Sequence, residues 1–383
     1  MLTIVVPVYW GRPQGQAPRP GDAIFDHPTP LDGESTLPPL LESLTRQDGG
    51  PPFRLLALVA PVAPELAIAA EARTRELLAP FARAFPVEQV GPSDLPHFRQ
   101  AAEAVGLEAG VINLHTYAGV RNLQLLAAHA LDSSAIVALD DDEVVPPDYL
   151  RIAAESLERE GVKGAAGFYE DDRGSVFLPE PSPSGNIFQD KPILMNEATR
   201  RLLDRSGRWV PTFVAFGGNM LFRRDLFTQV GFDPGITRGE DLDYVLNAHL
   251  AGVTFWLDKR LRITHRPPHW YNVSPYAKLA EDVRRFLYQR EKLRRAREEG
   301  MDPPTPKALM PYPGRFLQED LEEQALAALE AMATPEAVAC WGTPEEIVSR
   351  AVERARRLAP AYFAFARRWP ALVRAVGRGH YKG

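Results

Sequence analysis

Four consecutive acids follow a short apolar run in IVALDDDEVVP, residues 136–146. Carboxylates held two residues apart, as in Asp140 and Asp142, repel one another unless a cation lies between them. Hard divalent cations such as Mg²⁺ and Mn²⁺ prefer oxygen ligands and commonly bridge carboxylates to phosphates. One interpretation is therefore a site for a metal and a diphosphate. The alternative is a solvated turn whose acids cap a helix beginning near Pro147, and the acids alone do not decide between the two.

The elements around this cluster alternate between strand and helix. Apolar, β-branched runs predict strands at 2–9, 53–60, 87–90 and 135–139, and helical spacing predicts helices at 36–47, with Thr36 as N-cap, 64–85, 120–130 and 147–160. This alternation predicts an α/β fold with a mainly parallel, twisted sheet flanked by helices. In such sheets ligands bind beyond the carboxyl ends of the strands, which is where the four acids lie.

The rest of the chain is less regular. Between residues 162 and 264 the pattern predicts strands at 162–169, 213–222 and 254–264 and helices at 224–230 and 240–251. Beyond residue 274 the pattern is helical, apart from a proline-rich break at 302–314. Residues 10–35 are rich in Pro, Gly and Asp and predict a long loop, of a length that is often either functional or disordered.

Composition excludes several classes of protein. The chain has 383 residues, 45% of them hydrophobic, and a net charge of −6, which indicates a soluble globular protein without the basic field of a nucleic-acid binder. Its single cysteine, Cys340, excludes an intramolecular disulfide and a cysteine-based zinc site. No apolar run approaches the roughly 20 residues that cross a bilayer. The N-terminal run lacks basic residues and is broken by Pro7, so we expect no signal peptide and a cytoplasmic protein.

The C-terminal tail is basic. Residues 350–383 carry nine Lys or Arg against one Glu. This pattern is typical of a docked helix with a solvated basic face, and the alternative is a patch for peripheral contact with a membrane surface.

Five further segments occur in a fixed order around the acidic cluster: VVPVY from residue 5, GVRNLQLLAAHA from 119, FGGNMLF from 216, GEDLDYVL from 239 and LRITHRP from 261. With VALDDDEVV between them, this order resembles the GT-A glycosyltransferases, especially their large family 2 group. The resemblance covers roughly the first 270 residues, apart from the loop 10–35. It implies a Rossmann-like GT-A domain at 1–272, with a nucleotide-sugar-binding half at 1–160 and an acceptor-binding half at 161–272. Residues 273–383 would form a helical extension.

The resemblance also implies a reaction and a set of site residues. A sugar would move from a nucleotide-diphosphate-sugar donor to an acceptor hydroxyl, with Mn²⁺ or Mg²⁺ stabilising the leaving diphosphate. The donor would contact Pro7, Val8, Tyr9, Arg121, Asn122, Asp140 and Asp141. The metal would bind Asp142, His265 and Asp140, with His269 as a competitor for the histidine. The sugar or acceptor would contact Gly217, Gly218, Asn219, Arg266 and Trp270.

Glu240 and Asp241 match the catalytic pair of that family. In an inverting transfer, Asp241 would take the proton of the attacking hydroxyl. Both acids would also favour the positive end of the dipole of a helix that starts there. The segment 269–288 is a candidate lid, in which Trp270, Tyr271 and Tyr276 would offer flat faces to a sugar.

One departure and several alternatives remain. Family members commonly end the second strand with an Asp that reads the base, whereas residues 57–64 here read ALVAPVAP, so the nucleotide is not identified. A retaining GT-A enzyme acting on a small acid such as glycerate, similar to the mannosylglycerate synthases, would use Arg223, Arg224 or Arg266 to hold the carboxylate. A nucleotidyltransferase is less favoured because residues 10–20 lack its glycine-rich basic loop. The complete set of motifs argues against a catalytically silent binding protein.

Overall fold

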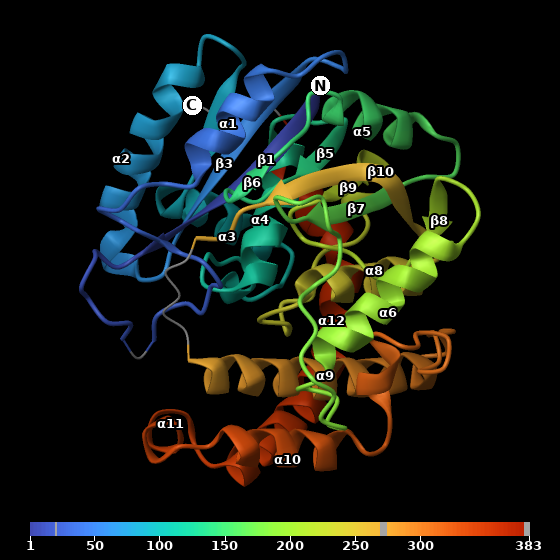
Figure 1. The fold of residues 1–383 in the computed structure, drawn as a ribbon. Coiled ribbons are helices and arrows are strands. Elements are labelled where there is room, and N and C mark those ends of the chain that lie inside the picture. The colour runs from blue at the N-terminus through green and yellow to red at the C-terminus, as the bar shows by residue number, and fades with distance from the viewer. Residues whose placement is uncertain (20, 269–273, 379–383) are drawn as a thin grey trace.

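The computed structural model describes residues 1–19, 21–268 and 274–378 (Figure 1). Within these residues ten strands form one sheet in the order β4–β3–β1–β5–β9–β7–β10–β6, with β2 beside β1 and β8 beside β10. The strands are β1 (Leu2–Gly11), β2 (Thr29–Pro30), β3 (Phe53–Pro61), β4 (Val87–Val90), β5 (Ala135–Ala138), β6 (Glu143–Val144), β7 (Gly164–Glu170), β8 (Trp209–Pro211), β9 (Met220–Arg223) and β10 (Phe255–His265).

The direction of β9 decides which residues meet at the edge of the sheet. Strands β4, β3, β1 and β5 are parallel, and β7 is parallel to β10, whereas β9 runs antiparallel to both β5 and β7. The carboxyl ends of β1, β5, β7 and β10 therefore lie at the same edge as the amino end of β9. The α/β prediction is confirmed; the sheet is parallel in its first half and mixed in its second.

Helices cover both faces of the sheet (Figure 1). In β1, alternate side chains point to opposite faces, as a pleated strand requires: one set packs with α1, α2 and α5, and the other with α3, α4 and α8. The helices are α1 (Leu37–Thr45), α2 (Ala67–Leu78), α3 (Leu95–Ala104), α4 (Tyr117–Ala130), α5 (Tyr149–Glu158), α6 (Lys191–Asp204), α7 (Arg224–Phe227), α8 (Glu240–Leu250), α9 (Pro275–Glu298), α10 (Leu321–Met332), α11 (Pro335–Trp341) and α12 (Pro344–Val376). Short 3₁₀ turns occur at Pro64–Leu66, Ala79–Phe81, Pro92–Asp94, Ala109–Val111 and Gly314–Leu317.

Several predicted elements differ from the structure. Thr36 occupies the N-cap position of α1 as predicted, but its hydroxyl makes no capping hydrogen bond, because Pro38 and Pro39, at the positions that would donate to it, have no N–H. The predicted helix 64–85 is divided into a 3₁₀ turn, α2 and a second 3₁₀ turn, with Pro80 following the end of α2. Of the predicted strand 213–222, only the last three residues form part of a strand, β9. The predicted helix 224–230 is shorter and consists of the single turn α7. Helices α3 and α6 were not predicted.

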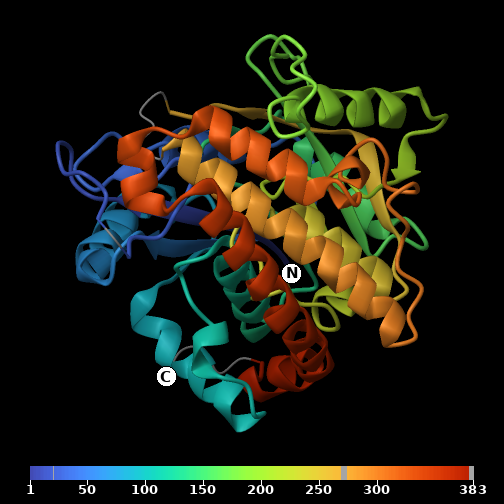
Figure 2. The ribbon, with the colours of Figure 1, turned by 90° about the horizontal axis from the view of Figure 1, so that it is seen from below.

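The C-terminal helices form a further layer beneath the sheet (Figure 2). Helix α12 packs against α9, α10, α3 and α4. The buried Trp369 anchors it, and the indole N–H donates to the Phe227 carbonyl at 2.9 Å. The tail is thus a docked helix whose basic side chains, such as Arg350 and Arg367, face solvent. Membrane contact and the boundary at residue 272 stay predictions.

No helix in the described ranges has the length and apolar character needed to cross a membrane.

A buried ionic cluster joins α9 to α8. Lys292 on α9 is fully buried, and its ammonium contacts Asp243 at 2.5 and 2.6 Å and Asp233 at 3.0 Å. It also donates to Asn247 at 2.9 Å. Charges removed from water in this way are stable only when they are paired. Because Asp243 lies in the first turn of α8, this cluster fixes the position of that turn.

We predict that Lys292→Met lowers the free energy of unfolding by about 3–5 kcal/mol, since it leaves two buried carboxylates without their cation. Urea unfolding measures the change. Arg294→Met is the matched control on the same helix, because Arg294 is 61% exposed, and a change of about 0.5 kcal/mol or less is expected there. Equal stability of Lys292→Met and wild type would contradict the prediction.

Candidate active site

A cavity of about 250 Å³ opens at the edge of the sheet where the strand ends meet. Its wall combines the end of β1, the acidic turn after β5, the start of α4, the loop before β9, the start of α8 and the end of β10. Of the residues predicted from the sequence, it is lined by Tyr9, Arg121, Asp140, Asp141, Asp142, Gly217, Glu240, Asp241 and His265.

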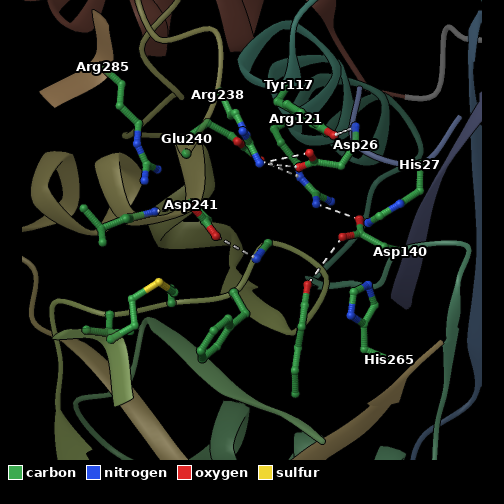
Figure 3. Close-up of a pocket in the computed structure, with 18 of the residues that line it drawn as sticks. Asp26, His27, Tyr117, Arg121, Asp140, Arg238, Glu240, Asp241, His265 and Arg285 are labelled. Atoms are coloured by element: carbon green, nitrogen blue, oxygen red, sulfur yellow. Dashed lines mark hydrogen bonds and ion pairs between the residues drawn. The ribbon is translucent and has the colours of Figure 1, made fainter. Parts of the chain in front are cut away.

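Arg121 lies at the centre of the polar wall (Figure 3). Its side chain is 3% exposed; Nη2 contacts Asp140 Oδ1 at 2.7 Å, and Nε contacts Glu240 Oε1 at 3.4 Å. Burial opposes its charge, but Asp140 and other neighbours outweigh burial and raise the pKa of Arg121 well above its ordinary value. The helix that carries it is capped by Thr116, whose hydroxyl accepts from the Gly119 N–H at 3.1 Å. A permanently charged guanidinium is thereby held between two carboxylates.

The carboxylates of the acidic turn, residues 140–143, contact different partners. Asp140 faces Arg121, whereas Asp142 Oδ2 lies 3.3 Å from His265 Nε2. Burial opposes protonation of His265, but its hydrogen bond to Asp142 outweighs that effect and raises the pKa of the imidazole. The side chain of Asp141 is buried, and burial together with the charges of Asp142 and Asp140 raises its pKa well above the usual range. These acids thus have different environments although they are adjacent.

Glu143 supports the turn from behind. It is fully buried, Oε2 accepts from the Asp140 N–H at 2.9 Å, and burial followed by the charges of Asp140 and Asp142 raises its pKa. A Cβ on Gly218 would lie 2.0 Å from Glu143 Oε1, so this close approach requires glycine. The helix-cap alternative for these acids is wrong, because α5 begins only at Tyr149 with Asp148 at its N-cap position.

Asp241 is aimed into the cavity by backbone donors. Its Oδ2 accepts from the Gly217 N–H at 3.1 Å, and Oδ1 accepts from the Leu242 N–H at 2.7 Å. Burial raises its pKa, although those two N–H groups and the charges of Arg285 and Arg121 act in the opposite direction. Burial, followed by the charge of Asp241, raises the pKa of Glu240 to about 7. Carboxylates with a raised pKa in a cavity are typical of groups that exchange protons with a ligand.

Several predicted residues do not reach the cavity. Asn122 exchanges two hydrogen bonds of 2.8 Å with the backbone of Phe232. Asn219 donates to the carbonyls of Phe168 and Leu261 and accepts from Tyr149. Both amides are completely used in holding the fold.

The remaining predicted residues are placed as follows. Val8 packs on the face of the sheet opposite to that of Tyr9. Pro7 and Gly218 are buried without lining the cavity. Arg266 is exposed and paired with Asp172. Trp270, Tyr271 and His269 lie outside the described residues. Tyr276 is 2% exposed and donates to the Gly342 carbonyl, so it offers no face to a sugar.

The loop 10–35 contributes residues that the sequence reasoning missed. Phe25 is buried against Tyr9, with ring centroids 4.5 Å apart, and against Tyr117 at 5.2 Å. This contact places the next two residues, Asp26 and His27, in the cavity wall. Their signal in the sequence was an acid and a histidine within an unusually long loop after the first strand.

The side chains present can contribute to a metal site but do not complete one. Among the residues that the structure describes, no three His, Cys, Asp or Glu side chains converge as a metal-binding group. Asp142 and His265 form a pair of potential ligands. The predicted third ligand, Asp140, is directed to Arg121 instead. This donor set fits a divalent ion that takes its other ligands from phosphate oxygens and water, as Mg²⁺ commonly does.

Comparisons with known proteins place the chain only loosely. No protein-family model matches it, and neither does any curated protein. Among solved structures, it is similar to the mannosyltransferase PcManGT from Pyrobaculum calidifontis in complex with GDP-Man and Mn²⁺, with 14% identity, a TM-score of 0.46 and coverage of 96% of this chain and 86% of that one. It is also similar to S. aureus TarS 1–349 in complex with UDP-GlcNAc, with 13% identity, a TM-score of 0.44 and coverage of 95% and 91%.

A third similar structure is GalNAc-T7 with UDP, GalNAc and Mn²⁺, with 13% identity, a TM-score of 0.43 and coverage of 74% of this chain and 47% of that one. At these identities and TM-scores, none of the three assigns a family or an activity to this chain.

We predict a pH dependence of stability from Glu240. Between pH 4.5 and about 7 the folded chain keeps a proton on this carboxyl that the unfolded chain releases. The stabilisation is therefore present below pH 4.5 and is lost as the pH rises through about 7. Glu240→Gln should flatten the fall of the unfolding free energy between pH 5 and 7, by at most about 1.4 kcal/mol per pH unit. Urea unfolding across this range measures the slope. The exposed Glu42→Gln should keep the wild-type slope, and equal slopes for Glu240→Gln and wild type would contradict the prediction.

Proposed function

We propose that this protein is a metal-dependent glycosyltransferase that moves a sugar from a nucleotide-diphosphate-sugar donor to an acceptor hydroxyl, with inversion. One observation carries the proposal: a single cavity holds the pair Asp142 and His265 on one side and Asp241 on the other, with Arg121 between them. The order of motifs that resembles GT-A enzymes places the same residues in donor and acceptor roles.

The side of the cavity lined by Asp142 and His265, here called the donor side, is suited to bind a diphosphate together with a metal ion. Asp142 and His265 would hold a divalent ion, Mn²⁺ or Mg²⁺, and the phosphate oxygens would supply further ligands. When bound, the ion neutralises the negative charge that gathers on the diphosphate as it leaves. Arg121 holds Asp140 in place at 2.7 Å, so that this carboxylate can accept a hydrogen bond from a donor hydroxyl. Tyr9, at the end of β1, lies in the wall where the nucleoside would bind.

Asp241 is suited to act as the base. Two backbone N–H groups fix its orientation, and burial raises its pKa, which improves a carboxylate as a proton acceptor near neutral pH. As the acceptor oxygen bonds to the anomeric carbon and the bond to the diphosphate breaks, the hydroxyl proton passes to Asp241. Glu240, which contacts Arg121, would position that guanidinium rather than touch the substrate.

The arginines first considered for binding the acceptor carboxylate in a retaining enzyme do not line the cavity. Arg224 donates to the Ser133 carbonyl and pairs with Asp132, and neither it nor Arg223 lines the cavity. The anomeric configuration of the product distinguishes retention from inversion.

We predict that Asp142→Ala weakens metal-dependent donor binding by at least about 10-fold, because it removes one of the two protein ligands of the ion. A panel of nucleotide-sugars with Mn²⁺ or Mg²⁺, followed by calorimetry and thermal shift, measures the effect. Asp148→Ala, an acid 44% exposed just before α5, should bind as wild type does. If no donor binds wild type with metal, the glycosyltransferase proposal is wrong.

We predict that Asp241→Asn keeps donor affinity but lowers the transfer rate by roughly 10²–10⁴-fold, because an amide cannot take the hydroxyl proton. Donor binding and product formation are measured on the same preparation. Asp225→Asn, at an exposed position of α7, controls for the substitution itself. Full transfer activity in Asp241→Asn would rule out the role of base.

A further inference from the structure

Beyond Asp241, the charged side chains of the cavity wall are mainly positive. Lys191 from α6, Arg238 from the loop before α8 and Arg285 from α9 all line it. Figure 3 shows Arg285 beside Asp241 and across the cavity from Asp140 and His265. Arg285 thus lies on the side opposite the residues proposed for the metal, and Lys191 is close to it, since both contact Asp282. The family resemblance gave none of the three cations a role.

Few carboxylates balance these cations. One acid, Asp282, serves two of them: it contacts Lys191 Nζ at 2.6 Å and Arg285 Nε at 3.0 Å. A second, Asp26, contacts Arg238 at 2.9 Å and also Lys278 at 3.0 Å. The three lining cations thus contact two acids, Asp282 and Asp26, and Asp241 also lies near Arg285.

These charges are also largely removed from water. The exposed fractions of the Lys191, Arg238 and Arg285 side chains are 21%, 20% and 7%. Cations in such surroundings carry a desolvation penalty, which a bound anion would reduce further.

The start of α8 adds to the positive potential, and the environment of Lys191 also favours an anion. A Cβ on Gly239 would lie 1.7 Å from Arg285 Nη1, so the guanidinium packs directly over the start of α8, where the helix dipole is positive. Burial also lowers the pKa of Lys191 to about 8; Asp282 opposes this effect, whereas Arg285 and Arg238 add to it. The charged form of the lysine is thus destabilised by burial and by two neighbouring cations, and a bound anion would offset both effects.

We propose that Lys191, Arg238 and Arg285 bind a carboxylate or phosphate group of a small acceptor, whose hydroxyl is then presented to Asp241. The proposal rests on the glycosyltransferase function above and names its acceptor class. The cations are recessed in a cavity of about 250 Å³, which fits a small anion rather than an extended surface. The basic groove formed by Arg284, Arg350, Arg354 and Arg357 lies outside this cavity and provides a control.

The first test measures binding to the full chain without donor or metal. Calorimetry compares three probes of similar size: glycerate, glycerol 3-phosphate and glycerol. We expect at least one anion to bind at least 10-fold more tightly than glycerol, and the two anions show whether carboxylate or phosphate is preferred. Lys191→Met should weaken that binding at least 10-fold, Lys191→Arg should restore much of it, and Arg350→Met should leave it unchanged.

The pH dependence of glycerate binding gives a second readout. The carboxylate of glycerate stays ionised from pH 7 to 9, as do Arg238 and Arg285. Asp282, whose pKa its cationic neighbours lower despite its burial, also stays ionised, and burial keeps Tyr312 neutral by raising its pKa. Lys191, with a pKa of about 8, loses its proton in that range, whereas Glu240 in the same cavity, with a pKa of about 7, loses most of its proton below pH 8. Wild-type affinity should therefore fall above pH 8, by at most about tenfold per pH unit, and the affinity of Lys191→Met should not.

Transfer assays separate this inference from the proposed function. Failure of every donor to bind with metal would reject the glycosyltransferase function and leave the anion measurements interpretable. If donor binding and hydrolysis are intact but wild type shows no preference for anions over glycerol, or Lys191→Met equals wild type, the anion site is rejected by itself. Urea unfolding checks that Lys191→Met is folded. If it is not, Arg238→Met carries the same expectation.

Discussion

The guanidinium of Arg121 contacts Asp140 at 2.7 Å and Glu240 at 3.4 Å, and its side chain is almost completely buried. One cation thereby joins the acidic turn after β5 to the first turn of α8. Without it, carboxylates from two distant segments would face one another in a poorly hydrated cavity, where like charges repel strongly. The arrangement of the acidic turn and the start of α8 around the cavity depends on that single charge.

Burial and hydrogen bonding give the neighbouring acids of the site different environments. Asp141 and Glu143 are buried, and burial together with the neighbouring acids raises their pKa values well above the usual range. Asp142 Oδ2 instead lies 3.3 Å from His265 Nε2. Asp241 is held by backbone N–H groups across the cavity. A run of similar residues in the sequence thus becomes a set of groups with separate tasks.

The C-terminal helices are part of this arrangement. Helix α9 supplies Arg285 to the cavity wall, and its Lys292 fixes the turn of α8 that carries Glu240 and Asp241. The family resemblance ends near residue 270 and gave α9 no role. Its contribution follows from packing, because α9 lies directly beneath α8 and contacts it through a buried ionic cluster.

Local sequence determined the central strands and the residues at their ends, because apolar β-branched runs and the acids that follow them need no distant partner to be recognised. In this way Tyr9, Asp140 to Asp142, Asp241 and His265 could be expected at one edge of the sheet. Only the tertiary structure decided which side chain of each motif reaches the cavity. Val8 belongs to the same motif as Tyr9 but points into the core, since adjacent residues of a strand face opposite sides. Asn219, in the turn before β9, is buried because its amide donates to the Phe168 and Leu261 carbonyls. Lys191, Arg238 and Arg285 come from separate segments whose proximity no local pattern encodes, and their shared positive charge exists only where α6, α8 and α9 pack together.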